Sequence, residues 1–149
     1  MNEELSIIYN KSLDILSRRE HSTKEIAQKL AKKFENKNSI QEVITKLVEN
    51  NLLNDVRFAE MYTKARKRKG FGPKKIFYEL LTKGLHEQDI NLAIHNEGEW
   101  ELAAKKVFQK KFPGGKLDDI KLLLKQKSFL INRGFGFKEI ESVFGNDMV

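Results

Sequence analysis

The sequence predicts an all-α fold of three tandem three-helix repeats that form an elongated, curved array. Its apolar residues recur at an offset of fifty positions. The recurring positions are Leu30, Leu80 and Leu130, then Ile40, Ile90 and Ile140, then Val43, Ala93 and Val143. Apolar residues also follow helical spacing, and no stretch alternates with period two for long enough to indicate a strand. We expect three-helix domains at residues 1–50, 51–97 and 98–149, each so short that it depends on its neighbours.

Helix-start signals divide the first repeat. Apolar residues at helical spacing predict a helix over residues 5–16. Ser22 and Glu25 form a capping box that begins a second helix, because the serine oxygen accepts from a backbone amide and the glutamate reaches back. Ser39 and Glu42 have the same spacing, which predicts that a third helix begins there.

The second repeat has the same plan. Asn54 or Asp55 caps its first helix, and Pro73 suits the first position of its second helix. Gly84 then ends that helix in the left-handed conformation that glycine adopts readily. A short helix over about residues 87–95 closes the repeat.

The third repeat begins with a helix near Trp100, a residue that we expect in the core. A long helix is predicted over residues 117–132, stopped by Gly134, and a last short helix follows. Phe135 and Phe137 lie in the turn between them. We expect them to pack against apolar residues of the last helix and so to fix the direction in which the chain enters it. The alternative is that they are exposed and contact a partner.

Basic residues cluster in the second and third repeats. The net charge is +7, which predicts an anionic partner, and no acidic residue interrupts the cations between Lys64 and Lys75. The candidate binding residues are Arg66, Lys67, Arg68, Lys69, Lys74, Lys75, Lys105, Lys106, Lys110 and Lys111. The alternative for the first cluster is a solvated helix end, where cations complement the helix dipole.

No catalytic or metal-binding motif is evident. His21, His86 and His95 lie in separate segments, and phosphate-loop, nucleophile-elbow and HExxH patterns are absent. There is no cysteine, and Asp118–Asp119 is interpreted as the acidic first turn of a helix. We therefore expect a protein that is not an enzyme and needs no cofactor and no metal.

Neither a membrane segment nor an export signal is apparent. No apolar run approaches the roughly 20 residues that span a bilayer, and Glu3 and Glu4 stand where a signal peptide would be basic. We expect a cytoplasmic protein without a membrane partner.

Residues throughout the chain resemble those of the RecX regulatory proteins, which modulate the RecA recombinase. In the first repeat they are Leu16 to Ser22, Glu25-Ile26 and Lys29-Leu30, followed by Leu53-Asn54-Asp55 and Arg57-Phe58-Ala59. In the second they are Gly70, Gly72-Pro73, Ile76, Glu79-Leu80 and Lys83-Gly84-Leu85. In the third they are Trp100, Phe129-Leu130, Arg133-Gly134-Phe135 and Ile140. The joint order and spacing of these residues carry the resemblance.

The resemblance implies a bent array of three-helix repeats that binds in the groove of the RecA filament on single-stranded DNA. It also implies inhibition of the RecA ATPase, strand-exchange and coprotease activities, and so restraint of recombination and the SOS response. The expected partners are the RecA nucleoprotein filament and single-stranded DNA, contacted directly or through RecA, and nothing demands a dimer. The basic residues would contact DNA phosphate, an acidic RecA surface, or both.

One segment departs from the family pattern. Lys33-Phe34 stands where the family commonly has a glycine after the second helix, so Asn36 or Asn38 is expected to supply the left-handed turn.

The alternative function is a stand-alone non-specific DNA-binding protein. Sequence-specific reading of duplex DNA is not favoured, because the second helices carry lysines rather than the combinations of Asn, Gln and Arg that discriminate bases.

Overall fold

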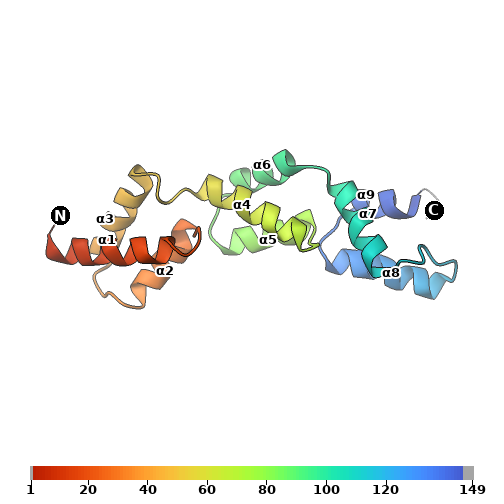
Figure 1. Ribbon diagram of the computed structural model, residues 1–149, viewed down its shortest axis with the longest axis horizontal. Helices are drawn as coiled ribbons and strands as arrows, with labels where there is room; N and C mark the ends of the chain where they lie inside the picture. Colours follow the sequence, from red (N-terminus) through yellow and green to blue (C-terminus); the bar gives the residue numbers. More distant parts are fainter. Residues whose placement is uncertain (1, 146–149) are drawn as a thin grey trace. The chain divides into compact units, whose positions relative to one another are not determined.

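The computed structural model describes residues 2–145, and this part of the chain contains nine helices and no strand (Figure 1). The all-α prediction is confirmed. The helices are α1 (Glu3–Leu16), α2 (Thr23–Ala31), α3 (Lys37–Glu49), α4 (Asp55–Arg68), α5 (Pro73–Thr82), α6 (Glu87–Glu97), α7 (Trp100–Lys111), α8 (Ile120–Asn132) and α9 (Phe137–Phe144).

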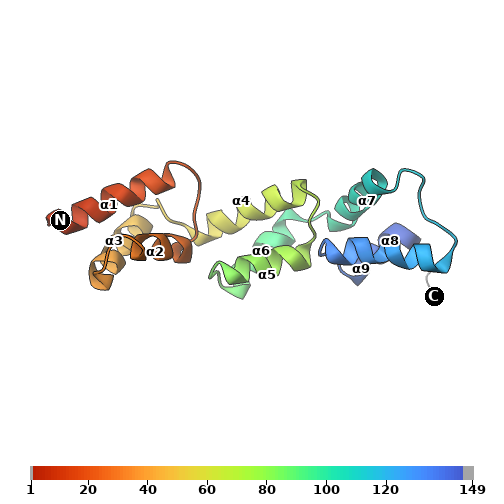
Figure 2. The same cartoon turned by 90° about the horizontal axis from the view of Figure 1, so that it is seen from below.

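The described residues divide into two compact units. The first contains the chain up to Ala59 together with Leu80–Ile90, and the second contains Glu60–Glu79 and the chain from Asn91 onward. In the first unit α3 packs against both α1 and α2 (Figure 2). Its core consists of Leu5, Ile8, Ile26, Leu30, Ile40, Val43, Ile44, Leu47 and Leu53.

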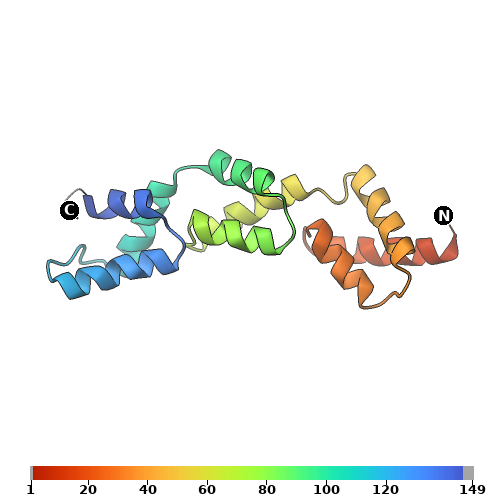
Figure 3. The same cartoon turned by 180° about the vertical axis from the view of Figure 1, so that it is seen from behind.

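The second unit has its core where α7 packs against α8 and α9 (Figure 3). The buried residues are Ala103, Ala104, Phe108, Leu130, Phe135, Ile140 and Phe144. Trp100 packs against this core from the start of α7, as predicted, and its indole Nε1–H donates to the Ile94 carbonyl over 2.9 Å.

The capping box predicted at the start of α2 is confirmed. The Glu25 amide donates to Ser22 Oγ over 3.2 Å, and the Ser22 amide donates to Glu25 Oε1 over 3.0 Å. The Ser22 hydroxyl also donates to the Lys83 carbonyl over 2.9 Å. The start of α2 is thereby joined to the end of α5 within the first unit. Nearby, His21 is buried, with Nδ1 3.0 Å from the Arg19 carbonyl oxygen, and therefore has a local packing role.

The predicted start of α3 is wrong. The helix begins at Lys37 because Asn36 Oδ1 accepts from the amides of Asn38 and Ser39 over 3.1 and 3.2 Å, one turn before the expected capping box. The left-handed turn expected at Asn36 or Asn38 is also wrong, since Asn36 is extended and α3 includes Asn38. No residue between α2 and α3 has a positive φ, so the chain makes this connection without a left-handed residue.

Two other helix starts refine the predictions. Asn54 caps α4 by accepting from the Arg57 amide over 3.0 Å, and Asp55 instead accepts from the Thr23 amide over 2.8 Å. The helix predicted from residue 117 begins at Ile120, because Asp119 Oδ1 accepts from an amide of its first turn.

The two phenylalanines before α9 have different roles. Phe135 precedes the N-cap residue, Gly136, and shares the core with Ile140, the fourth residue of the helix. This arrangement is the predicted hydrophobic contact. Phe137 is 74% exposed, so the same prediction is wrong for this residue.

Candidate anion-binding cleft

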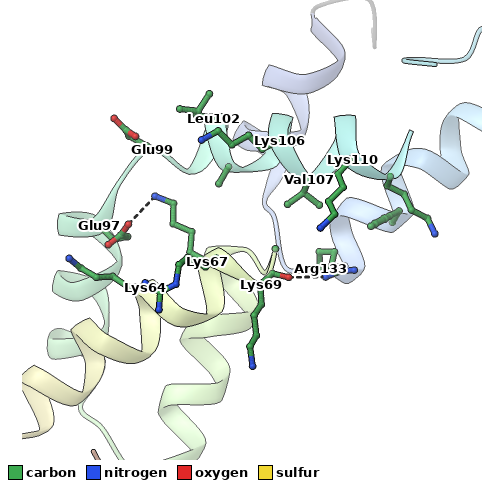
Figure 4. Close-up of a pocket in the computed structure, with 15 residues that line it drawn as sticks. Lys64, Lys67, Lys69, Glu97, Glu99, Leu102, Lys106, Val107, Lys110 and Arg133 are labelled. Carbon is green, nitrogen blue, oxygen red and sulfur yellow. Dashed lines mark hydrogen bonds and ion pairs between the residues drawn. The ribbon is translucent and has the colours of Figure 1, made fainter. Parts of the chain in front are cut away.

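A basic cleft of about 670 Å³ lies in the second unit (Figure 4). Its walls come from the end of α4, the connection between α6 and α7, the length of α7, and the end of α8. The lining residues are Lys64, Lys67, Arg68, Lys69, Gly70, Glu97, Glu99, Leu102, Ala103, Lys106, Val107, Lys110, Lys111, Phe129 and Arg133.

Backbone hydrogen bonds hold the turn after α4 against the end of α8. The Gly72 amide donates to the Arg133 carbonyl over 2.7 Å, and the Lys74 amide donates to the Gly134 carbonyl over 2.9 Å. A Cβ added at Gly72 would lie 2.5 Å from the Gly134 carbonyl carbon, and one at Gly134, where φ is +97°, would clash with the Lys75 Cβ. Only glycine permits this close approach.

Positive charge dominates the cleft, because eight basic residues line it against two acidic ones. Lys67 is engaged within the fold: its Nζ lies 3.0 Å from Glu97 Oε2 and donates to the Gly98 carbonyl over 2.8 Å. Lys106 and Lys110, one turn apart on α7, are exposed, as are Arg68 and Lys69 at the end of α4. The cleft therefore combines exposed cations with one ion pair that is made within the fold.

Part of the cleft lining is apolar. Leu102 and Val107 contribute aliphatic side chains from α7, and Phe129 contributes a ring from α8. Lys111 Nζ lies 5.5 Å from the centroid of that ring, and the Arg133 guanidinium carbon lies 5.1 Å from it. Both distances suit cation–π attraction, which places further positive charge beside the Phe129 ring.

The structure brings together six of the ten predicted binding residues. They are Lys67, Arg68, Lys69, Lys106, Lys110 and Lys111. Lys74, Lys75 and Lys105 do not line the cleft: Lys74 borders a separate hollow, Lys75 Nζ lies 5.6 Å from the centroid of the Phe71 ring, and Lys105 is exposed elsewhere on α7.

Arg66 has a structural role within the second unit. Its Nε and Nη2 donate to the two carboxylate oxygens of Glu79 over 2.9 and 2.7 Å, and its guanidinium carbon lies 3.9 Å from the Phe71 ring centroid. Tyr62 donates to the same carboxylate over 2.8 Å. Burial by itself would raise the pKa of Glu79, but the hydrogen bonds from Arg66 and Tyr62 outweigh it, so its pKa is lowered.

Two basic residues of the cleft were not among the predicted ones. Lys64 lies one turn before Lys67 on α4, so helical spacing alone would have placed it on the same face. Arg133 enters the cleft only because α8 ends beside the turn after α4, where its Nη1 donates to the Lys69 carbonyl over 3.3 Å. No local sequence signal indicates that position.

Among residues 2–145, no cluster of three or more His, Cys, Asp or Glu residues could hold a metal ion. In the same range, no helix combines the length and apolar character needed to cross a membrane.

Comparisons with known proteins find one family. Models of the first, second and third three-helix domains of RecX match residues 9–47, 54–94 and 99–144. "Regulatory protein RecX" of Pseudomonas fluorescens is 32% identical over 148 residues, which cover 98% of this chain and 96% of the relative. "Regulatory protein RecX" of Halorhodospira halophila is 33% identical over 132 residues, which cover 88% of this chain and 82% of the relative.

The fold is also found in a solved structure. The crystal structure of RecX from Lactobacillus salivarius matches with a TM-score of 0.83 at 24% identity, over 97% of this chain and 96% of that one. At this identity the likeness shows the fold, which includes the predicted three-helix repeats.

Proposed function

This chain belongs to the RecX family of regulatory proteins, and we propose that it binds RecA filaments on single-stranded DNA and inhibits their ATPase, strand-exchange and coprotease activities. In this role it restrains recombination and the SOS response. The protein shares the cytoplasm with the DNA, acts as a monomer and performs no catalysis of its own. Its repeats are the predicted domains at 1–50, 51–97 and 98–149, of which residue 1 and residues 146–149 lie outside the described part of the chain.

The observation that carries the proposal is the convergence of exposed cations from α4 and α7 on one cleft. Lysines make point-charge contacts, which suit a row of phosphates or carboxylates and require no fixed bidentate geometry. The filament offers both kinds of anion. The ion pair of Lys67 and the hydrogen bond from Arg133 hold the walls in place, so the backbone of the cleft needs little reorganisation on binding.

Charge reversal in the cleft tests the proposal. The triple variant Arg68→Glu, Lys106→Glu and Lys110→Glu alters three exposed residues and leaves the Arg66–Glu79 and Lys67–Glu97 ion pairs intact. We expect at least about tenfold weaker binding to RecA assembled on single-stranded DNA. A plot of the logarithm of the binding constant against the logarithm of the salt concentration should become less steep. Its slope should fall by about one unit for each phosphate that the variant no longer neutralises. Inhibition of the RecA ATPase should weaken in parallel.

A matched variant controls for net charge. Lys32→Glu, Lys37→Glu and Lys46→Glu change the net charge equally at exposed positions of the first unit. We expect filament binding within about twofold of the unmodified protein, because surface charges away from a contact contribute little. ATPase inhibition that is unchanged in the cleft variant would contradict the assignment of this cleft.

The rival function, non-specific DNA binding without RecA, predicts a different affinity ranking. If the protein binds bare single-stranded DNA as tightly as RecA-coated DNA at the same salt concentration, the rival is correct. Stronger binding to the coated strand supports the regulatory proposal.

A further inference from the structure

Two acidic residues, Glu97 and Glu99, line the otherwise basic cleft. Both lie where α6 passes into α7. The Glu97 carboxylate is paired with the Lys67 ammonium, and the two side chains are only 20% and 18% exposed. Glu99 is exposed, and its side chain points away from Lys67 (Figure 4). Glu97 therefore contacts a cation of the cleft directly, whereas Glu99 adds negative charge to the lining without that contact.

Lys67 differs from the other lysines of the cleft because its ammonium group already has partners. Its Nζ lies 3.0 Å from Glu97 Oε2, donates to the Gly98 carbonyl over 2.8 Å, and lies 5.2 Å from the centroid of the Trp100 ring. Lys106 and Lys110 are exposed. An anion that enters the cleft can contact these two lysines at once, but it must compete with Glu97 for Lys67.

The helix that carries Glu97 does not explain the presence of this residue. Glu97 is the last residue of α6. The C-terminal end of a helix has a partial negative charge, so a carboxylate at this position is unfavourable. The ion pair with Lys67 offsets this cost, although a partly exposed pair contributes little to stability. The contact with Lys67 is therefore the better explanation for Glu97.

A polyanion bound in the cleft would favour an exchange of partners by Lys67. Negative charge held by Lys106 and Lys110 would repel the Glu97 carboxylate and attract the Lys67 ammonium, because all four groups line the same cleft. An ammonium group has three N–H donors, so Lys67 can keep its hydrogen bond to the Gly98 carbonyl while it changes its anionic partner. The exchange moves side chains and leaves the backbone of the cleft in place.

We propose that Glu97 is an internal competitor that holds Lys67 until a polyanion occupies the exposed cations of the cleft. This inference rests on the anion-binding role proposed above and adds a means of regulating it. Displacement of Glu97 costs the same free energy for every anion that takes Lys67. The cost therefore matters most for a small anion, which makes few other contacts. The cleft is thereby biased towards the rows of charge on a filament.

Calorimetric titration of the full-length chain with inorganic tripolyphosphate tests the proposal. Glu97→Gln and Glu99→Gln each remove one negative charge from the lining, but only the first also releases Lys67 from a carboxylate. We expect Glu97→Gln to bind tripolyphosphate at least about threefold more tightly than Glu99→Gln. When each is combined with Lys67→Gln, the two should bind with affinities within about 1.5-fold of each other, because no ammonium remains to be released.

A second substitution covers the case in which glutamine still holds Lys67. Glu97→Ala removes the acceptor altogether and should bind tripolyphosphate at least as tightly as Glu97→Gln. Circular dichroism of each variant establishes that it is folded at the titration temperature. In the RecA ATPase assay, Glu97→Gln should inhibit at a lower concentration than Glu99→Gln, because the filament then meets a cleft with one more available cation.

Several results would overturn the proposal. Equal gains from Glu97→Gln and Glu99→Gln would mean that Glu97 acts through net charge alone. Weaker binding by both Glu97 variants would give the residue a purely structural role. A difference that persists with Lys67→Gln, or no tripolyphosphate binding by any variant, would also exclude the competition.

These failures are distinguishable from failure of the proposed function. The latter is tested by charge reversal at Arg68, Lys106 and Lys110 and measured on the filament. If that reversal leaves filament binding unchanged while the calorimetric differences appear as expected, the cleft binds anions under the control of Glu97 but is not the filament contact.

Discussion

Removal of the charge on Glu25 should destabilise the first unit at neutral pH. The Glu25 carboxylate is only 14% exposed and lies 3.2 Å from Arg19 Nη2 and 3.1 Å from Lys83 Nζ. It also accepts from the Ser22 amide. Burial by itself would raise the pKa of Glu25, but these hydrogen bonds and the nearby positive charge outweigh it and lower the pKa from 4.5 to about 2.

The size of the effect follows from the pKa. At about 1.36 kcal/mol for each pH unit, the lowering of the Glu25 pKa corresponds to about 3 kcal/mol of folding free energy at neutral pH. Because the folded-state pKa lies below the unfolded-state value, this stabilisation is fully present above about pH 5. It is lost as the pH falls from the unfolded-state pKa of 4.5 towards the folded-state pKa of about 2.

The variant Glu25→Gln measures this contribution. Glutamine can still accept from the Ser22 amide, so the capping box is retained while the charge is removed. Urea unfolding followed by circular dichroism should show the variant less stable by up to about 3 kcal/mol at pH 7, with a difference that shrinks as the pH approaches 2. Glu42→Gln, at an exposed position of α3, is the control and should change stability by less than about 0.5 kcal/mol.

Two outcomes would refute this reasoning. One is that the free energies of unfolding of Glu25→Gln and the unmodified protein differ by the same amount at pH 7 and pH 3. The other is a difference below about 1 kcal/mol at pH 7, the value expected of a surface ion pair.

Three further substitutions test other parts of the structure by the same unfolding measurement. Gly134→Ala should lower the free energy of unfolding by about 2 kcal/mol or more, because it adds a Cβ at φ +97° against Lys75. The control is Gly114→Ala, which should change stability little because no atom lies within 4 Å of the added Cβ. Arg66→Lys should cost about 1–3 kcal/mol, since lysine cannot make both hydrogen bonds to the Glu79 carboxylate. Asn36→Ala should cost about 1 kcal/mol through removal of the α3 cap, and unchanged stability would contradict the observed helix start.

Local sequence signals predicted the helices well and their first residues less well. Apolar periodicity is a property of each segment, so it located helices in all three repeats. The first residue of a helix depends on which of several nearby polar side chains accepts from the free backbone amides. In α3 this side chain is Asn36 and not Ser39. Competition between neighbouring caps is not visible in a motif.

The candidate site was predicted in part. Charge density identified the end of α4 and the length of α7, but it did not separate Arg66, which is held by Glu79, from Arg68, which is exposed. The two lie two residues apart on α4 and therefore point in different directions. The carboxylate that distinguishes them is on α5, and only packing brings it there.

The sequence by itself determined the helical class, the fifty-residue repeat and the excess of basic residues in the second and third repeats, because these depend on spacing and composition. Tertiary structure alone decided that Arg133 joins the cleft and that Phe137 is exposed while Phe135 is buried. The physical reason is that each of these outcomes depends on contacts between residues far apart in the chain. The close approach of Gly72 to Gly134 is one such contact, and it places the end of α8 beside the turn after α4.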